Sequence, residues 1–369
     1  MIDTELSALV APGIPGLSPY LPGKPISELE RELGISGAIK LASNENPLGP
    51  SPQAVAAMTQ ALAEVARYPD GGGFALRHAL AARHGVDDSC VTLGNGSNDV
   101  LDLVARTFLQ PGTNAVFSEH AFAVYPIATQ AAGAGGRVAL AKAYGHDLAA
   151  MRQLVDQDTR VVWIANPNNP TGTYLGENAL WGFLEALPKT TLAVVDEAYI
   201  EYVEAPDYPD TSRWLVNFPR LIVTRTFSKA YGLAGLRVGY GLSHPKVAAL
   251  LNRVRQPFNI NNLAQTAALA ALADQAHIRT TVMLHRRGMN QLTLGFRALG
   301  LAFIPSQGNF VTVDVGRPAG PVDQALLRAG VIVRPVANYG LPNHLRVTVG
   351  HSGENQRFLK ALAEILAKT

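Results

Sequence analysis

The segment Thr226-Phe227-Ser228-Lys229, with Arg237 eight residues beyond the lysine, carries the clearest chemical signal in this chain. It follows an apolar run at residues 221–224 that predicts a buried strand. A lysine at the end of such a strand is unusual unless its charge is tuned or used. Thr226, Ser228 and Arg237 are side chains that bind phosphate. The pattern suits a lysine that forms a Schiff base with pyridoxal 5'-phosphate (PLP), although an ordinary surface Ser-Lys turn explains this segment alone equally well.

Two other expected strands also end in polar clusters. The run at residues 91–93 precedes Gly94-Asn95-Gly96-Ser97-Asn98-Asp99, which opens a helix. Glycines and a helix N-terminus favour anions, and simple turn chemistry explains this cluster about as well. The run at residues 161–164 precedes a rigid, proline-rich loop at residues 166–172. In this loop, Asn169 offers an amide donor to the phenolic oxygen of a cofactor.

The fourth cluster, Asp196-Glu197-Ala198-Tyr199, follows an apolar run at residues 192–195. A carboxylate at the end of a buried strand loses solvation and needs a cationic partner to stay ionised. A protonated pyridine nitrogen is such a partner, whereas a helix N-cap is the ordinary alternative for an isolated aspartate. Ligands of open α/β sheets bind at the carboxyl ends of the strands. The four clusters together therefore predict one PLP site at a sheet edge.

Composition narrows the classes of function. The chain has 369 residues, of which 47% are hydrophobic, and this allows a large core and excludes a disordered chain. A net charge of +2 gives no basic face for nucleic acid. The single cysteine, Cys90, excludes an internal disulfide and Cys-based zinc sites, and no metal is expected. Residues 1–6 lack a signal-peptide pattern and no apolar stretch reaches membrane-spanning length, so we expect a cytoplasmic protein without membrane partners.

The order of patterns along the chain predicts an α/β fold in which a mainly parallel sheet is sandwiched by helices. Apolar runs, including one at residues 115–117, alternate with amphipathic helices from about residue 90. After Pro257 the pattern changes to long helices over roughly residues 262–298, followed by shorter mixed elements. We expect three parts: an arm at residues 1–45 that packs on the small domain or a partner subunit, a large PLP-binding domain at residues 46–262 and a small domain at residues 263–369.

Local sequence patterns predict the bounds of several individual helices and strands. A helix is expected at residues 26–33, and Ser51 can cap a helix in which Pro52 takes the first position. Towards the C-terminus we expect an apolar segment at residues 310–315, a helix at 321–329, strands at 331–335 and 345–349, and a last helix from Glu354.

These residues resemble the fold-type-I PLP-dependent aminotransferases, and within them the histidinol-phosphate aminotransferases. The resemblance covers nearly the whole chain. The lysine segment and the Asp-x-x-Tyr motif are typical of the superfamily, while Pro257-Phe258-Asn259-Ile260-Asn261 and residues 18–25 are typical of this branch. Residues 41–47, 67–69 and 345–350 follow in the expected order.

The resemblance implies roles for individual residues. Lys229 forms the Schiff base and moves the proton, Asp196 pairs with the pyridine nitrogen, and Tyr199 with Asn169 binds the phenolic oxygen. The groups implied to hold the cofactor phosphate are Ser97, Asn98, Thr226, Ser228, Arg237 and, from the other subunit of a homodimer, Tyr68. Phe122 falls where family members often carry a ring-stacking tyrosine, and it keeps the stacking surface without the hydroxyl. The residues implied to contact substrate are Tyr20, Asn46, Arg334 and Arg346.

The reaction implied by the resemblance is a ping-pong transamination of L-histidinol phosphate with 2-oxoglutarate, which gives imidazole-acetol phosphate and glutamate in histidine biosynthesis. Arg346 would bind the substrate phosphate and then the α-carboxylate of glutamate. Two alternatives use the same scaffold: an aromatic amino-acid (phenylalanine/tyrosine) aminotransferase and a PLP-dependent decarboxylase of a phosphorylated amino acid. A PLP-fold regulator would need an added helix-turn-helix, for which this chain has no room.

Overall fold

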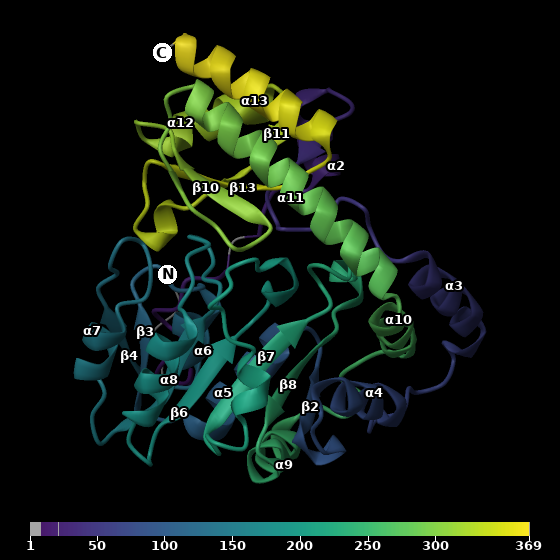
Figure 1. Ribbon diagram of the computed structural model, residues 1–369, viewed down its shortest axis with the longest axis vertical. Helices are drawn as coiled ribbons and strands as arrows, with labels where there is room; N and C mark the ends of the chain where they lie inside the picture. The colour runs from purple at the N-terminus through teal and green to yellow at the C-terminus, as the bar shows by residue number, and fades with distance from the viewer. Residues whose placement is uncertain (1–8, 21, 369) are drawn as a thin grey trace.

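The computed structural model describes residues 9–20 and 22–368, in which two layers, each built on a β-sheet with helices, lie one above the other (Figure 1). The arm expected at residues 1–45 is therefore described only from residue 9 and without Leu21. Residues 1–6, on which the expected absence of a signal peptide rests, lie outside the described residues. No helix in the described part of the chain is long and apolar enough to cross a membrane.

The larger sheet has seven strands, in the order β2-β8-β7-β6-β5-β3-β4. Only β8 runs antiparallel to its neighbours, so the carboxyl ends of the other six strands meet at one edge. The strands are β2 (Val91–Gly94), β3 (Asn114–Ser118), β4 (Gly135–Ala139), β5 (Thr159–Ala165), β6 (Leu192–Asp196), β7 (Leu221–Thr226) and β8 (Gly239–Ser243). This mainly parallel α/β arrangement confirms the predicted fold class and all five apolar runs expected as strands.

Helices cover both faces of the large sheet, because side chains of one strand alternate between two cores. Ala193 and Val195 of β6 belong to one core, and Leu192 and Val194 belong to the other. The helices of the first core are α3 (Pro52–Ala61), α4 (Phe74–His84), α7 (Leu148–Gln153), α8 (Glu177–Glu185) and α10 (Asn262–Ala273). Those of the second are α5 (Ser97–Phe108), α6 (Val124–Ala131) and α9 (Pro245–Val254).

The smaller sheet is antiparallel, with the order β12-β13-β10-β9. Its strands are β9 (Phe303–Ile304), β10 (Phe310–Asp314), β12 (Arg334–Pro335) and β13 (His344–Thr348). They share a core with α11 (Gln275–Ala298), α12 (Ala319–Arg328) and α13 (Ser352–Ala367), which form the upper part of Figure 1. A two-stranded parallel ladder of β1 (Ile39–Lys40) and β11 (Val331–Ile332) ties the early chain to this layer.

The remaining elements are short. The helix α2 spans Ile26–Leu33, as predicted, and the Ser51 hydroxyl accepts the Ala54 amide at the start of α3, also as predicted. The 3₁₀ turns are Leu62–Glu64, Asp88–Cys90, Ile200–Tyr202, Thr211–Trp214, Ala234–Leu236 and Ala337–Tyr339.

The division into domains at residues 262–263 stays a prediction. The helix just beyond that boundary, α10, packs against α3 and α4 of the lower layer. The next helix, α11, runs from the lower layer up to the small sheet (Figure 1). The two layers are thus joined by a single long helix as well as by the early segment that contains β1.

Candidate active site

A cavity of about 180 Å³ lies at the carboxyl edge of the large sheet. Its walls come from the ends of β5, β6 and β7, the start of α5, the early segment at residues 42–44 and two strands of the small sheet. Most of the site residues selected from the sequence line this one cavity: Tyr20, Ser97, Asn98, Phe122, Asn169, Asp196, Tyr199, Thr226, Ser228, Lys229, Arg237, Arg334 and Arg346. The four polar clusters that follow separate strands therefore meet in space.

The Lys229 amine sits in this cavity three residues beyond β7. Its Nζ donates to the backbone carbonyl of Ser43 at 3.0 Å and lies 5.8 Å from the centre of the Tyr199 ring. Burial lowers the pKa of Lys229 to about 7, and the positive charges of Arg346 and Arg237 act in the same direction. The amine is therefore substantially neutral near pH 7, which a nucleophile or a general base requires.

The Asp196 carboxylate ends β6 in a fully enclosed position. Its Oδ2 accepts the hydroxyl of Tyr125 at 3.0 Å, but Oδ1 has no hydrogen-bond partner among the described residues. Burial raises the pKa of Asp196 to about 6. A buried carboxylate oxygen without a donor is costly, and a cationic N–H from a bound molecule would satisfy it.

Tyr199 and Asn169 flank the same space. Asn44 donates its amide nitrogen to the Tyr199 hydroxyl at 2.9 Å, and burial raises the pKa of Tyr199 to about 12. The carbonyl oxygen of Asn169 accepts from Nη1 of Arg346 at 2.6 Å. That bond leaves the amide nitrogen of Asn169 as the group that can donate to a ligand.

Hydroxyls and one arginine converge at the start of α5. The Thr226 hydroxyl accepts the Ser228 amide at 3.1 Å, and Arg237 reaches the Ser228 hydroxyl at 3.4 Å. A Cβ added to Gly96 would lie only 2.4 Å from Nη2 of Arg237, so the glycine leaves space for the guanidinium. Ser97 begins the 12-residue helix α5, whose N-terminus favours an anion. This cup fits a phosphate.

The donor set as a whole fits PLP. The partnerless Oδ1 of Asp196 suits a protonated ring nitrogen, and the cup around Arg237 suits the phosphate of the same molecule. Lys229 lies in the same cavity, where its amine can reach an aldehyde carbon. Among the described residues, no group of three or more His, Cys, Asp and Glu side chains could hold a metal ion.

Two more cationic side chains line the cavity. Arg346 is buried, donates from Nη2 to the Ala42 carbonyl at 2.5 Å and has a buried Nε without a partner. Arg334 lies over the ring of Tyr20 with 5.7 Å between the guanidinium carbon and the ring centre. Phe122 is half-buried and meets Tyr125 edge to face, so its ring is available to a flat ligand.

Asn46 and Tyr68 do not line the cavity. The amide of Asn46 donates to the Ala230 carbonyl and to Thr281, and its expected substrate contact stays a prediction. Asn46 thus fixes the loop in which it lies. The Tyr68 side chain is 82% exposed and stacks on Phe258 at 4.7 Å, away from the cavity of its own chain.

Among the cavity residues that sequence reasoning did not select are two with polar side-chain contacts in the site, Tyr125 and Asn44. Tyr125 donates to Asp196 from α6, and a tyrosine within an apolar helix carries no local sign of that contact. Asn44 lies in the quoted segment at residues 41–47, but its partner Tyr199 is 155 positions away. Only the folded chain brings them together.

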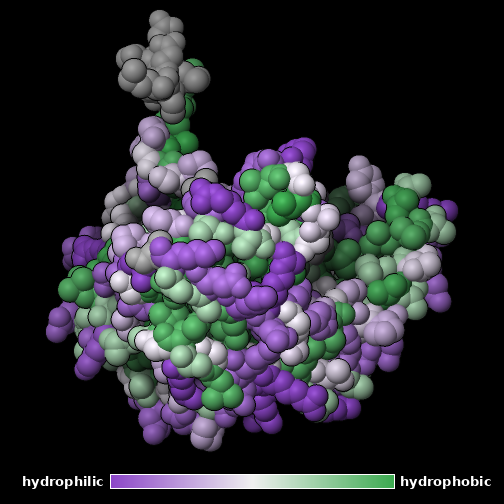
Figure 2. All heavy atoms as spheres, turned by 90° about the horizontal axis from the view of Figure 1, so that it is seen from above, coloured by the Kyte–Doolittle hydropathy of each residue, from purple (hydrophilic) through white to green (hydrophobic). Residues whose placement is uncertain are grey.

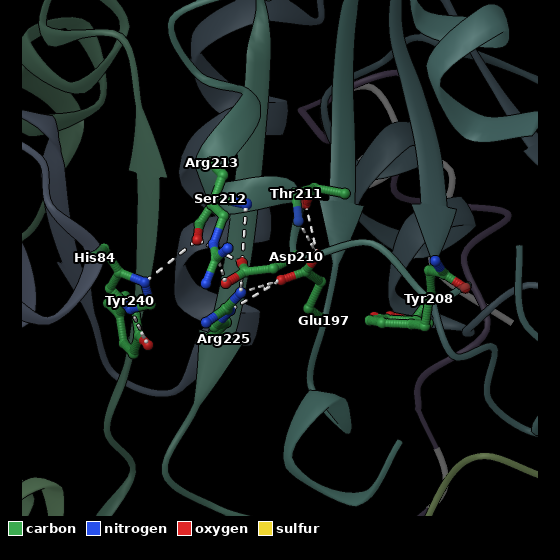
Figure 3. A network of polar contacts seen from close by, with 10 residues as sticks. His84, Glu197, Tyr208, Asp210, Thr211, Ser212, Arg213, Arg225 and Tyr240 are labelled. Carbon is green, nitrogen blue, oxygen red and sulfur yellow. Dashed lines mark hydrogen bonds and ion pairs between the residues drawn. The ribbon is translucent and has the colours of Figure 1, made fainter. Parts of the chain in front are cut away.

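A buried ion-pair network lies beside the cavity (Figure 3). Glu197, which has no exposed surface, accepts from Nε and Nη2 of Arg225 at 2.9 and 2.7 Å. It also accepts the amide and hydroxyl of Thr211, and Arg225 reaches Asp210 at 2.5 Å. His84 extends the network through its contacts with Ser212 and Tyr240. The network joins the end of β6 to the end of β7.

Comparison with known proteins agrees with this geometry. The family model for aminotransferase class I and II matches residues 36–362. Histidinol-phosphate aminotransferase 2 of Pseudomonas fluorescens is 63% identical and that of Pseudomonas aeruginosa 61% identical, each over 99% of both chains. The crystal structure of histidinol-phosphate aminotransferase from Sinorhizobium meliloti in complex with pyridoxal-5'-phosphate is similar with a TM-score of 0.90 and 30% identity, over 97% of this chain and 98% of that one.

The Glu197→Gln substitution should destabilise the fold strongly. It leaves the buried Arg225 guanidinium without its main counter-charge, and breaking such a pair costs about 3–5 kcal/mol. The matched control is Glu204→Gln, which breaks an exposed pair with Arg286 and should cost about 0–1 kcal/mol. Urea unfolding followed by circular dichroism gives both free energies. Equal losses in the two variants would contradict the importance of the buried network.

The pH dependence of Lys229 acylation tests its lowered pKa. In protein stripped of cofactor, the neutral amine is the reactive form, so labelling should rise with pH and reach half its maximum near pH 7. Lys24 is the internal control, because a hydrogen bond with Glu32 raises its pKa above the ordinary value for lysine. Mass spectrometry of the two peptides reports both profiles. A Lys229 midpoint as high as that of Lys24 would contradict the burial effect.

Proposed function

We propose a transamination of L-histidinol phosphate with 2-oxoglutarate for this chain, which belongs to the aminotransferase class I and II family. The products are imidazole-acetol phosphate and glutamate, and the cofactor is PLP. Support comes from full-length relatives at 61–63% identity that carry the name histidinol-phosphate aminotransferase. The reaction places the enzyme in histidine biosynthesis.

The observation that carries the substrate assignment is the presence of three arginines on one small cavity. Arg237 belongs to the phosphate cup through its contact with Ser228, and it accounts for the anionic end of the cofactor. Arg334 and Arg346 line the same cavity, where their positive charges favour a second anion. A guanidinium fork binds a phosphate or a carboxylate in a bidentate manner, so the same pair can serve histidinol phosphate and glutamate in turn.

When bound, PLP supplies an electron sink that stabilises negative charge on the α-carbon of the substrate. Asp196 would accept the ring N–H at Oδ1 and so keep the ring nitrogen protonated. Tyr199 and Asn169 would donate hydrogen bonds to the phenolic oxygen. Lys229, whose pKa is lowered to about 7, would accept the α-proton of the substrate at Nζ and hold it there for its return. Thr226, Ser228 and Arg237 would hold the phosphate.

The enzyme acts as a homodimer in this proposal. Five large apolar side chains, Leu62, Val65, Tyr68, Phe74 and Phe258, are between 45% and 82% exposed. Apolar side chains gather on the side of α3 in the space-filling view (Figure 2), and apolar surface of this kind marks interfaces. A second copy of the chain would cover it and receive Tyr68 at its own cofactor phosphate. We place the enzyme in the cytoplasm, which fractionation of source cells would check.

A single-turnover titration tests the substrate. Histidinol phosphate, added to the purified yellow protein without 2-oxoglutarate, should convert the cofactor absorbance to that of the pyridoxamine form. Phenylalanine and threonine phosphate, added at the same concentrations, should act at least ten times less efficiently, because each lacks one of the recognised groups. Bleaching by phenylalanine alone would support an aromatic aminotransferase instead. A colourless protein that binds no added PLP would overturn the whole proposal.

Co-expression of two inactive variants tests the shared site. A dimer of one Tyr68→Ala chain and one Lys229→Ala chain has one site that retains both side chains. Random pairing then restores intact sites to about a quarter of all sites. The purified mixture should be more active than the average of the two parent variants assayed separately. Activity equal to that average would contradict a contribution of Tyr68 across the interface.

A further inference from the structure

Three consecutive residues of the early chain touch three different groups of the site. The Ala42 carbonyl accepts from Arg346, the Ser43 carbonyl accepts from Lys229, and the Asn44 side chain donates to Tyr199. This segment passes between the layers, where Leu41 bonds to Ile332 and to Thr348 through its backbone. The segment is therefore placed to orient the side chains of Arg346, Lys229 and Tyr199 in the cavity.

The amide of Asn44 has one orientation, and Thr348 determines it. The Thr348 hydroxyl oxygen accepts the backbone N–H of Asn44 at 2.9 Å, so its single proton must point elsewhere. Oδ1 of Asn44 lies 3.1 Å from that hydroxyl and accepts the proton. The carbonyl side of the amide therefore faces Thr348, and the Nδ2 side faces Tyr199 at 2.9 Å.

The same reasoning determines the direction of the Tyr199 hydroxyl. Its oxygen accepts from Nδ2 of Asn44, so the phenolic proton cannot point towards that donor. Burial raises the pKa of Tyr199 to about 12, and the hydroxyl keeps its proton at neutral pH. Tyr199 lines the cavity, and the proton is available to an acceptor there.

We propose that Asn44 and Thr348 are positioning residues that fix the Tyr199 hydroxyl as a hydrogen-bond donor to the phenolic oxygen of bound PLP. The inference rests on the proposed function, because it requires PLP in the cavity. Thr348 is two residues from Arg346 on β13, so the strand that carries the substrate-binding arginine also orients a cofactor-binding group. Asn309 holds the Asn44 backbone by donating to its carbonyl at 3.0 Å.

Asn46 of the same segment forms a second asparagine–threonine pair with Thr281 of α11, and this pair offers a matched control. Asn46 donates to the hydroxyl of Thr281 at 3.1 Å, and both residues are buried, as Asn44 and Thr348 are. Neither Asn46 nor Thr281 lines the cavity. A threonine-to-valine change in each pair replaces one hydroxyl by a methyl group of similar size. Only Thr348→Val should affect the cofactor.

The test is a pH titration of the visible absorbance of PLP bound to Lys229. A hydrogen bond donated to the negative phenolic oxygen disfavours the protonated form of the lysine–cofactor unit. Loss of that hydrogen bond in Thr348→Val should therefore raise the pH midpoint of the absorbance change by on the order of one pH unit. Asn44→Ala, which removes the donor to Tyr199 directly, should raise it by a similar amount. Thr348→Ser, which keeps the hydroxyl, and Thr281→Val should titrate as the wild type does.

The Tyr199→Phe background separates positioning from a general structural effect. If Thr348 acts through Tyr199, Thr348→Val should cause no further shift once the tyrosine hydroxyl is absent. A shift that persists in that background would overturn the inference, and so would equal midpoints in wild type and both Thr348→Val and Asn44→Ala. Failure of the wild type to bind PLP would instead overturn the proposed function. Should Thr348→Val not fold, Asn44→Ala and its double variant with Tyr199→Phe decide the matter.

Discussion

The site depends on a buried carboxylate that the chain leaves half-satisfied. Oδ2 of Asp196 accepts the hydroxyl of Tyr125, and Oδ1 is buried with no hydrogen-bond partner among the described residues. A cationic N–H from a bound ligand would offset this cost, and in the proposed function that N–H belongs to the ring nitrogen of the cofactor. Lys229 is the complement, a buried amine whose pKa is lowered to about 7, so that much of it is neutral at that pH. Asp196 would gain a cationic hydrogen-bond donor from a bound cofactor, and Lys229 would gain an aldehyde with which to react.

The geometry of the strands places functional side chains and buried charged side chains on opposite sides of the same sheet edge. Successive residues of an extended chain point to opposite sides, so Asp196 and Thr226 face the cavity while their neighbours Glu197 and Arg225 face away. The neighbours form the buried ion pair that connects the ends of β6 and β7 (Figure 3). Asp196 and Thr226 are thus each next in sequence to one member of this ion pair, which holds the two strand ends together.

The sequence predicts the apolar central strands of the large sheet better than the strands that have few apolar side chains. The runs at residues 161–164, 192–195 and 221–224 are strands because nearly every side chain there is apolar and both faces are covered. The strands β4 and β8 escape prediction because they begin with glycine and carry few apolar side chains. Their pairing is decided by neighbouring strands, which is a tertiary effect.

Residue types at strand ends also select most of the residues that line the cavity, but they do not separate Asn44 from Asn46. Asn44 and Asn46 sit two positions apart in the same segment, and only the folded chain decides which one reaches Tyr199. The sequence of that segment favours neither. The choice is made by Thr348, which holds the first asparagine against the cavity, while Ala230 and Thr281 hold the second away from it. Function at this edge is therefore assigned by hydrogen-bond direction, a property that residue type alone does not encode.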